Sequence, residues 1–257
     1  MGQRKQTQSS ELTLPEPKSP GLRRLLRPLL WSSPYRYWLF GMVRQRKNIL
    51  SRQFDLLIDG YPRSANTFAV YTFKTAQHRE TRISSHHHNP AAVVAAIRMR
   101  KPVLVLARDP IDAVASWTVF SGYPLKYNLE TYINYYSELL KYKGSFEVGE
   151  FGEVTKQFPF VIDRLNRRFG TKFETPVVDL LNPKRIFEAI ERNFEIENGY
   201  VDENRVSRPS EQRELFKRTV REELEGPDLE PLRRQATALF TAMQGKTSAD
   251  AAIAAKC

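Results

Sequence analysis

Two short stretches of the sequence combine cations, hydroxyl groups and helix starts in the way that anion binding requires. The first, GYPRSANTF at residues 60–68, follows an apolar run and precedes a helix-like pattern. The first amides of a helix lack partners within it, and the helix dipole adds partial positive charge there. Arg63 adds a planar fork of N–H donors that suits phosphate or sulfate. Further side-chain donors come from Ser64, Asn66 and Thr67.

The second stretch, RDPIDAVAS, runs from Arg108 to Ser116. Arg108 ends a continuous apolar run, and a helix that begins near Pro110 would turn Ser116 toward the same crevice as the first stretch. The two residues would make a second anion pocket, which suits a ligand with two separated phosphate groups. For either stretch taken singly a structural role is an alternative, because Arg108 has Asp109 and Asp112 nearby as ion-pair partners.

The first stretch differs from the loop of ATP- and GTP-binding proteins, G-x-x-x-x-G-K-[ST]. Gly60 and Thr67 occupy the first and last positions of that pattern, but Ala65 and Asn66 replace the second glycine and the lysine. That lysine reaches the β- and γ-phosphates, so its absence argues against a conventional nucleoside triphosphatase. An atypical P-loop kinase that uses ATP and Mg²⁺ is the alternative enzyme. It requires an acidic metal ligand near the loop, whereas the run PVLVLAR ends in Arg108.

The elements expected around these stretches alternate between strands and helices. The apolar runs FDLLIDG (54–60) and PVLVLAR (102–108) predict buried strands, and TRISSHHH (81–88) predicts a short extended piece. Helical patterns follow each of them, at residues 67–79, 89–101 and 109–120. Continuous apolar runs indicate strands that are buried on both faces. The order predicts a P-loop-like, three-layer α/β fold with a central parallel β-sheet flanked by helices.

The second half of the chain is expected to be mostly helical. Helical patterns cover residues 129–143, 154–170, 183–194 and 210–225. One further strand is expected in SFEVGEF at residues 145–151. We predict that residues 53–257 form one domain and that residues 1–52 form a basic, partly flexible N-terminal extension.

The net charge of +11 is concentrated in that extension. Residues 1–52 hold eleven Lys and Arg against two Asp and Glu, whereas the other residues hold 29 against 27. A nucleic-acid-binding domain more often spreads its positive charge over a folded face, so we expect no nucleic-acid partner. Residues 21–52 interleave arginines with Leu, Trp and Tyr, and two interpretations stay open. The arm either makes peripheral contact with a membrane surface or an acidic partner, or packs over the domain. A membrane-surface or nucleic-acid binding protein that works through this arm is therefore the non-enzymatic alternative.

The composition points to a cytoplasmic protein. No apolar run reaches the roughly 18 residues of a transmembrane helix, and no signal-peptide core follows the basic start. A single cysteine, Cys257, leaves no pair for an internal disulfide and no cysteine-rich metal site. We expect a cytoplasmic location, peripheral at the membrane if the arm binds lipid.

Together the two stretches resemble the motifs of sulfotransferases that use 3′-phosphoadenosine 5′-phosphosulfate (PAPS), of the soluble, bacterial type. The family's first motif has the form Y-P-K-S-G-T-T-W, and this chain has YPRSANTF at residues 61–68. The second has the form R-N-P-x-D-x-x-x-S, and this chain has RDPIDAVAS. The similarity covers about residues 54–120 and continues more weakly to residue 170. Arg63 replaces a lysine and keeps its charge, and Ala65 replaces a glycine by the next smallest residue.

This resemblance implies transfer of a sulfuryl group from PAPS to a hydroxyl, or to an amine, of a small-molecule, glycan or lipid acceptor, with 3′,5′-adenosine bisphosphate (PAP) as the product. It implies a 3′-phosphate bound by Arg108 and Ser116, and an adenine stacked on Phe68. The residues implied for the 5′-phosphosulfate are Arg63, Ser64, Ala65, Asn66 and Thr67. No metal is required when protein cations, above all Arg63, stabilise the leaving phosphate.

Three histidines stand together in SSHHHNP, between the two motifs. On a strand only His86 and His88 would share a side, and no carboxylate or cysteine stands near in sequence to complete a metal site. The family has a catalytic histidine here, in a K-T-H-x-P stretch. Aligned on Pro90, His88 takes the histidine position and His86 the lysine position. This implies His88 as the base for the acceptor proton and His86 as a second donor to the transferred group, although a small insertion would exchange them.

A late basic segment, NRVSRPSEQR, is a candidate for further nucleotide contacts through Arg205, Arg208 and Ser210. The family has a basic segment in that role, but its common K-G-containing form is absent here. The alternative is an arginine-bearing loop in which Ser210 caps the next helix.

The helical second half should also carry the acceptor pocket. It is rich in aromatic residues, which fit a hydrophobic core better than a stacking platform: Tyr132, Tyr135, Tyr136 and Phe146.

Overall fold

The computed structural model describes residues 18–19, 21, 53–176, 183–198 and 211–245. The predicted extension at residues 1–52 lies almost entirely outside these ranges, so the division into extension and domain stays a prediction. None of the helices in the described part of the chain has the length and apolar character that crossing a membrane requires.

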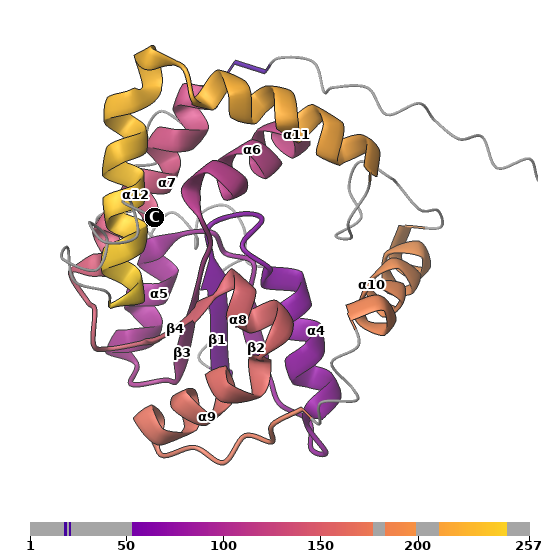
Figure 1. Ribbon diagram of the computed structural model, residues 1–257. Coiled ribbons are helices and arrows are strands. Elements are labelled where there is room, and N and C mark those ends of the chain that lie inside the picture. The colour runs from indigo at the N-terminus through magenta and orange to yellow at the C-terminus, as the bar shows by residue number, and fades with distance from the viewer. Residues whose placement is uncertain (1–17, 20, 22–52, 177–182, 199–210, 246–257) are drawn as a thin grey trace, which may run out of the picture.

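A four-stranded parallel sheet lies at the centre of the described residues (Figure 1). Its strands are β1 (Leu56–Gly60), β2 (Ile83–Ser85), β3 (Val103–Ala107) and β4 (Glu147–Glu150). Their order is β2-β1-β3-β4, with Ile58 paired to Ser85 on one side and to Leu104 on the other. The chain runs outward from β1 to β2 and then crosses to β3 on the other side of β1. The direction of winding reverses between β1 and β3, so the loops that follow these two strands leave toward opposite faces of the sheet. The space between the two loops is the kind of crevice that binds ligands in α/β proteins.

Helices cover both faces of the sheet, as the sequence predicts. One face carries α5 (Pro90–Arg98), α6 (Pro110–Ser121), α7 (Leu125–Leu140) and α12 (Glu230–Gln244). The other face carries α4 (Asn66–Ala76), α8 (Phe151–Lys156), α9 (Phe158–Phe169) and α10 (Pro183–Asn198). Figure 1 shows α5, α7 and α12 together on one side and α4 on the opposite side. The predicted three-layer α/β architecture is therefore confirmed.

The strands β1 and β3 are buried along their whole length, and their side chains alternate between two hydrophobic clusters. Leu57 and Val105 pack with α5, α6, α7 and α12, whereas Ile58 and Leu104 pack with α4, α8, α9 and α10. This is why the apolar runs in the sequence are continuous: each neighbouring residue has its own layer of helices to pack against.

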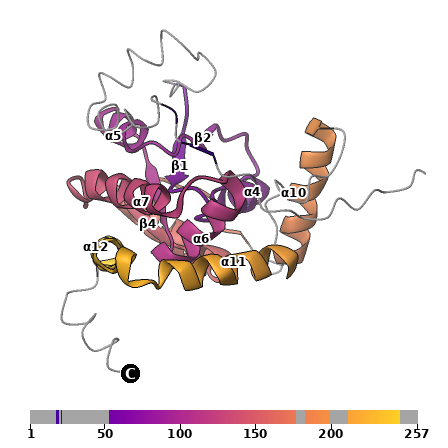
Figure 2. The same ribbon diagram turned by 90° about the horizontal axis from the view of Figure 1, so that it is seen from above.

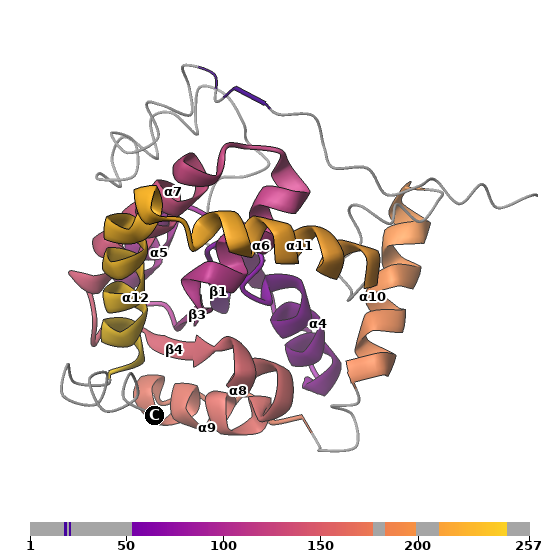
Figure 3. The ribbon, with the colours of Figure 1, turned by 45° about the horizontal axis from the view of Figure 1, so that its top comes forward.

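One further helix, α11 (Glu211–Leu224), crosses α6 at the carboxyl end of the sheet. Figures 2 and 3 show α11 beside α6, with α12 turning down along α7 at one end. Through Val220 and Leu224, α11 joins the same cluster as α6 and α7. It thereby stands over the crevice between β1 and β3.

The helix starts follow from their capping residues. Asn89 Oδ1 accepts the Ala91 amide (3.0 Å) at the start of α5, and Asp109 Oδ1 accepts the Asp112 amide (3.1 Å) at the start of α6. Each of these caps is followed by a proline, whose missing N–H costs nothing at that position.

The structure corrects the predicted elements in three places. Residues 154–170 form the end of α8 and then α9 rather than one helix, because Pro159 cannot continue the hydrogen-bond ladder of α8 and instead lies in the first turn of α9. The extended piece at 81–88 ends at Ser85, since His86 and His88 have positive φ angles of 60° and 47°. The helix α12 has no counterpart in the prediction.

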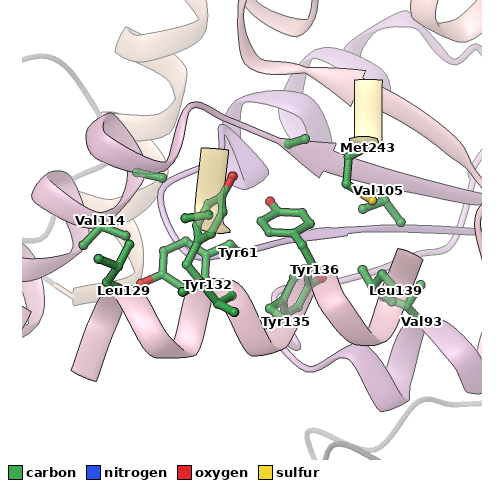
Figure 4. Packing of buried hydrophobic residues seen from close by; sticks show 14 of the residues in the cluster. Tyr61, Val93, Val105, Val114, Leu129, Tyr132, Tyr135, Tyr136, Leu139 and Met243 are labelled. Atoms are coloured by element: carbon green, nitrogen blue, oxygen red, sulfur yellow. The ribbon is translucent and has the colours of Figure 1, made fainter. Parts of the chain in front are cut away.

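Four tyrosines fill the layer between the sheet and α7 (Figure 4). Tyr132 Oη donates to the Arg108 carbonyl (2.7 Å), and Tyr136 Oη donates to the Leu106 carbonyl (2.8 Å). Tyr61 Oη donates to a carbonyl of α7, that of Asn128, at 2.9 Å. The fourth tyrosine is Tyr135. Tyr132, Tyr135, Tyr136 and Phe146 are all buried, which confirms that they belong to the core.

Candidate active site

A cavity of about 380 Å³ opens at the carboxyl ends of β1 and β3, between α4, α6 and α11. Nine of the sequence-predicted site residues line it: Arg63, Ala65, Asn66, Thr67, Phe68, His86, His88, Arg108 and Ser116. The two motifs and the histidine segment, whose lining residues lie up to 53 positions apart in the sequence, therefore meet in one place.

The loop between β1 and α4 has a strained backbone that opens toward the cavity. Arg63 and Ala65 both have left-handed φ angles, of 68° and 67°, and Ala65 caps α4. A non-glycine residue in that region costs of order 1–3 kcal/mol, and such sites gather where a backbone binds a ligand. Asn66 Nδ2 holds the turn by donating to the Tyr61 carbonyl (3.1 Å). Together with the start of α4, this geometry suits an anion.

Gly60 is required by the close approach of β1 to β3. A Cβ atom at this position would lie 2.5 Å from the Leu106 carbonyl oxygen, which is backbone and cannot yield. The glycine thus brings the loop directly beside the end of β3.

Arg63 links the two motifs. Its Nε donates to Ser116 Oγ on α6 (3.1 Å), and its guanidinium lies 5.3 Å from the centre of the Phe120 ring. Arg108 Nη1 donates in turn to the Arg63 carbonyl (3.0 Å). The cations of both motifs therefore belong to one continuous site.

Arg108 contacts several neighbours, but one of its N–H donors makes no hydrogen bond. Its guanidinium lies 4.0 Å from the centre of the Phe151 ring, and Nη2 lies 3.7 Å from Asp112 Oδ2. The ion pair with Asp112 is the structural alternative that the sequence left open. Asp112 is shared, however, because Arg221 Nη2 approaches its other oxygen to 2.7 Å. Arg108 Nε is buried and has no hydrogen-bond partner among the described residues. Buried N–H donors are nearly always hydrogen-bonded, and a ligand oxygen in the cavity would supply an acceptor for Arg108 Nε.

The helix α11 adds further charge that the sequence analysis missed. Arg213, Lys217 and Arg221 recur every four residues and so share one helix face, which was the available signal. Lys217 and Glu214 line the cavity and form an ion pair with each other. Arg213 is 5% exposed.

The electrostatics of the cavity favour an anion. Burial, followed by Arg213 and Arg108, lowers the pKa of Arg63 to about 10. Burial also lowers the pKa of Lys217, with Arg108 and Arg63 adding to the effect and Glu214 opposing it. Arginine stays protonated at neutral pH, so Arg63 keeps its positive charge although burial and, to a smaller extent, the neighbouring cations oppose it, and an anionic ligand would offset that charge.

His86 and His88 both face the cavity, with ring centres 5.8 Å apart. Both nitrogens of His86 have hydroxyl neighbours, Thr67 Oγ1 at 3.1 Å from Nε2 and Ser85 Oγ at 2.9 Å from Nδ1. Although part of the ring is exposed, desolvation, with smaller effects of His88 and Lys74, lowers the pKa of His86 to about 4. His86 is therefore a neutral ring at pH 7.

His88 has a different environment. Its Nδ1 lies 2.7 Å from the Gly60 carbonyl oxygen. A carbonyl only accepts, so Nδ1 carries the proton, and in the neutral ring Nε2 carries the lone pair. This is the tautomer that a general base needs.

Four predicted residues lie away from the cavity or outside the described residues. Ser64 is fully buried and does not line the cavity, and its amide donates to the Tyr61 carbonyl (3.2 Å). Arg208 and Ser210 fall in residues 199–210, outside the described part of the chain, as does Arg205. Their assigned contacts stay predictions.

Phe68 lies at the cavity wall but is only 4% exposed and packs against Phe187 at 5.6 Å. Its predicted stacking on adenine therefore stays a prediction. Sequence reasoning missed the rest of the aromatic wall, which consists of Trp117, Phe120, Phe151 and Phe187. The described residues contain no group of three or more side chains placed to hold a metal ion.

No protein-family model matches the chain, and no curated protein matches it. Among solved structures, the chain is similar to the crystal structure of mouse sulfotransferase SULT7A1 complexed with PAP, with a TM-score of 0.38 and 13% sequence identity. The match covers 74% of this chain and 91% of the mouse chain.

Proposed function

We propose that the protein is a sulfotransferase, which uses PAPS to transfer a sulfuryl group to a hydroxyl, or to an amine, of an acceptor. The observation that carries this proposal is the half-buried group of cations Arg63, Arg108 and Lys217, which line the cavity at the crevice between β1 and β3. A site with this charge, an unpartnered Arg108 Nε and a helix start fits a ligand with more than one anionic group. The motif resemblance of residues 61–68 and 108–116 identifies which ligand of that class to expect.

The residues divide into two groups by position. The loop at residues 63–67 and the start of α4 would hold the 5′-phosphosulfate, and Arg108 and Ser116 would hold the 3′-phosphate. Lys217 on α11 reaches the same cavity and adds a further cation. When bound, PAPS supplies the sulfuryl group and leaves as PAP.

His88 is the proposed base. In the tautomer fixed by the Gly60 carbonyl, Nε2 takes the proton of the acceptor hydroxyl while the acceptor oxygen forms its bond to sulfur. The bond between sulfur and the phosphate oxygen breaks, and its electron pair stays on the phosphate. Arg63 and Lys217 stabilise the charge that develops there. The hydroxyl contacts of His86 suit the second-donor role better than that of the base.

Calorimetric titration with PAP, in the absence of Mg²⁺, tests this proposal on the full chain. We expect micromolar binding, and we expect Arg108→Ala to weaken it roughly 30- to 150-fold, because a charge-assisted contact contributes about 2–3 kcal/mol. Arg82→Ala is the matched control, since Arg82 pairs with Asp55 away from the cavity and should leave binding unchanged.

Absence of PAP binding by the wild-type chain would overturn the sulfotransferase proposal. If ATP with Mg²⁺ bound instead, the kinase alternative would take its place. PAP binding that Arg108→Ala leaves intact would show that the ligand sits outside this cavity, which also contradicts the proposal.

A further inference from the structure

A buried carboxylate lies directly behind His88. Asp59 is the one charged residue of β1, between Ile58 and Gly60, and none of its surface is exposed. Its Oδ1 accepts the amide of His88 (3.2 Å) and lies 3.8 Å from His88 Nδ1. A charge inside a hydrophobic core is unfavourable unless something compensates it, so its presence in the middle of an apolar strand requires a reason.

We infer that Asp59 is a positioning residue for His88, which fixes the ring at the cavity wall and stabilises the imidazolium formed when Nε2 takes up a proton. This inference rests on the proposed role of His88 as the base. It concerns a residue that touches neither donor nor acceptor, since Asp59 does not line the cavity.

The first half of the argument is geometric. The Asp59 carboxylate holds the His88 backbone, and the Gly60 carbonyl next to it holds the His88 ring. His88 has a left-handed backbone (φ 47°), which is costly for a histidine and has to be held by such contacts. Two consecutive residues of β1 thus determine both the position and the tautomer of the ring.

The second half is electrostatic. A protonated His88 would stand in a cavity that already contains Arg63, Arg108 and Lys217, and these cations oppose a further positive charge. Asp59 is the negative group placed to offset that charge, at 3.8 Å from Nδ1. Without it, His88 would be a weaker base near neutral pH.

The other groups facing Asp59 are compatible with an ionised carboxylate. Tyr135 Oη donates to Oδ2 (3.4 Å), Tyr136 lies next to it on α7, and His87 adds a favourable interaction from the segment after β2. Burial nevertheless raises the pKa of Asp59 to about 6, so the carboxylate is largely ionised only above that pH. The charge is therefore present in the range where His88 would act.

Histidine titration by NMR on the full chain tests the inference without an acceptor. The ¹⁵N and ¹³C signals of His88 report both its pKa and its tautomer. We expect Asp59→Asn, which keeps the shape and an acceptor for the His88 amide, to lower the pKa of His88 by one unit or more. That is at least a tenfold loss of proton affinity. Asp55→Asn changes a carboxylate that lies just before the start of β1 and pairs with Arg82, and it should leave the pKa of His88 unchanged.

An unchanged pKa and tautomer of His88 in a folded Asp59→Asn protein would overturn the inference. If that variant does not fold, the wild-type protein alone decides: the His88 signals should shift a second time as the Asp59 carboxyl titrates, and the absence of such coupling would contradict the role. PAP titration separates this result from the proposed function. Asp59→Asn should bind PAP within twofold of wild type, whereas a wild-type chain that binds no PAP would remove the sulfotransferase proposal and leave the Asp59–His88 coupling measurable.

Discussion

Replacing Asp59 by Asn should stabilise the fold above about pH 6, although it removes the carboxylate that we assign to positioning His88. Burial raises the pKa of Asp59 from 3.8 to about 6, which means that the folded state binds this proton more tightly than the unfolded chain does. The stabilisation that goes with the proton is complete below about pH 4 and is lost as the pH rises through 6. A shift of about 2 pKa units corresponds to about 3 kcal/mol, which the neutral Asn would recover at pH 7.5.

Urea denaturation of wild type and Asp59→Asn between pH 4 and pH 7.5 measures this effect. The difference in free energy of unfolding should be near zero at pH 4 and should grow to about 3 kcal/mol in favour of Asn at pH 7.5. Packing differences between the two side chains do not depend on pH, so the slope isolates the charge. A difference that is constant over this range would refute the reasoning, because the carboxyl of Asp59 would then have the same pKa in the folded and the unfolded chain, and burial would not raise it.

Asp55→Asn is the matched control, with the opposite sign. Hydrogen bonds from the Arg82 amide and side chain lower the pKa of Asp55, so its ionised form stabilises the folded state. That contribution is present above the unfolded pKa of about 4 and is lost as the pH falls below it. Asp55→Asn should therefore reduce stability at pH 7.5 and approach wild type in acid.

Three further substitutions test the structure around the site. Gly60→Ala should destabilise the protein by about 3 kcal/mol or more, seen as a large fall in Tm, because its Cβ would lie 2.5 Å from the Leu106 carbonyl oxygen. Ala65→Gly should leave Tm unchanged or slightly higher. Glycine adopts the left-handed φ of 67° without strain, which offsets the roughly 0.5–1 kcal/mol of extra conformational entropy that it loses on folding. A clear fall in Tm would contradict the strain assigned to this loop. Arg164→Met should lower the free energy of unfolding in urea by about 2 kcal/mol. Arg164 Nε donates to the nearly buried Glu147 at 2.8 Å, and the Glu147 carboxylate would lose that partner. An unchanged urea midpoint would show that this ion pair contributes nothing to stability.

The sheet and its flanking helices could be predicted because their determinants are local. The runs at 54–60 and 102–108 are apolar at every position, and Asn89 and Asp109 mark helix starts by their side chains alone. The break between α8 and α9 also has a signal in the sequence, because Pro159 cannot stand in the interior of a helix without disrupting it. The helix α12 also has a signal in the sequence, because Leu232, Ala236, Leu239 and Met243 recur at helical spacing.

The site was predicted where its residues follow strand ends, and missed where it depends on distant packing. Parallel strands bring their carboxyl ends to one edge, which is why Arg63 and Arg108 could be placed together. The four-residue spacing of cations on α11 marks a charged helix face, but nothing local indicates that Lys217 packs beside Arg63 and Arg108, about a hundred residues or more earlier in the chain. Asp59 did leave a signal, a charge in a buried strand, but its meaning depends on the left-handed turn that places His88 against it.

The late position of α11 and α12 in the chain has a consequence for biosynthesis. The sheet is complete once β4 ends at Glu150, whereas α12 ends at Gln244. At 5–20 residues per second, a ribosome needs about 5–20 s to make the intervening segment. During that time the apolar side chains of α6 and α7 lack the part of their packing that Leu224 and Met243 later supply, and Lys217 has not yet reached the cavity. The growing chain thus passes through a stage in which its strands are made but its ligand cavity is incomplete. At that stage part of the apolar surface of α6 and α7 is accessible to a chaperone.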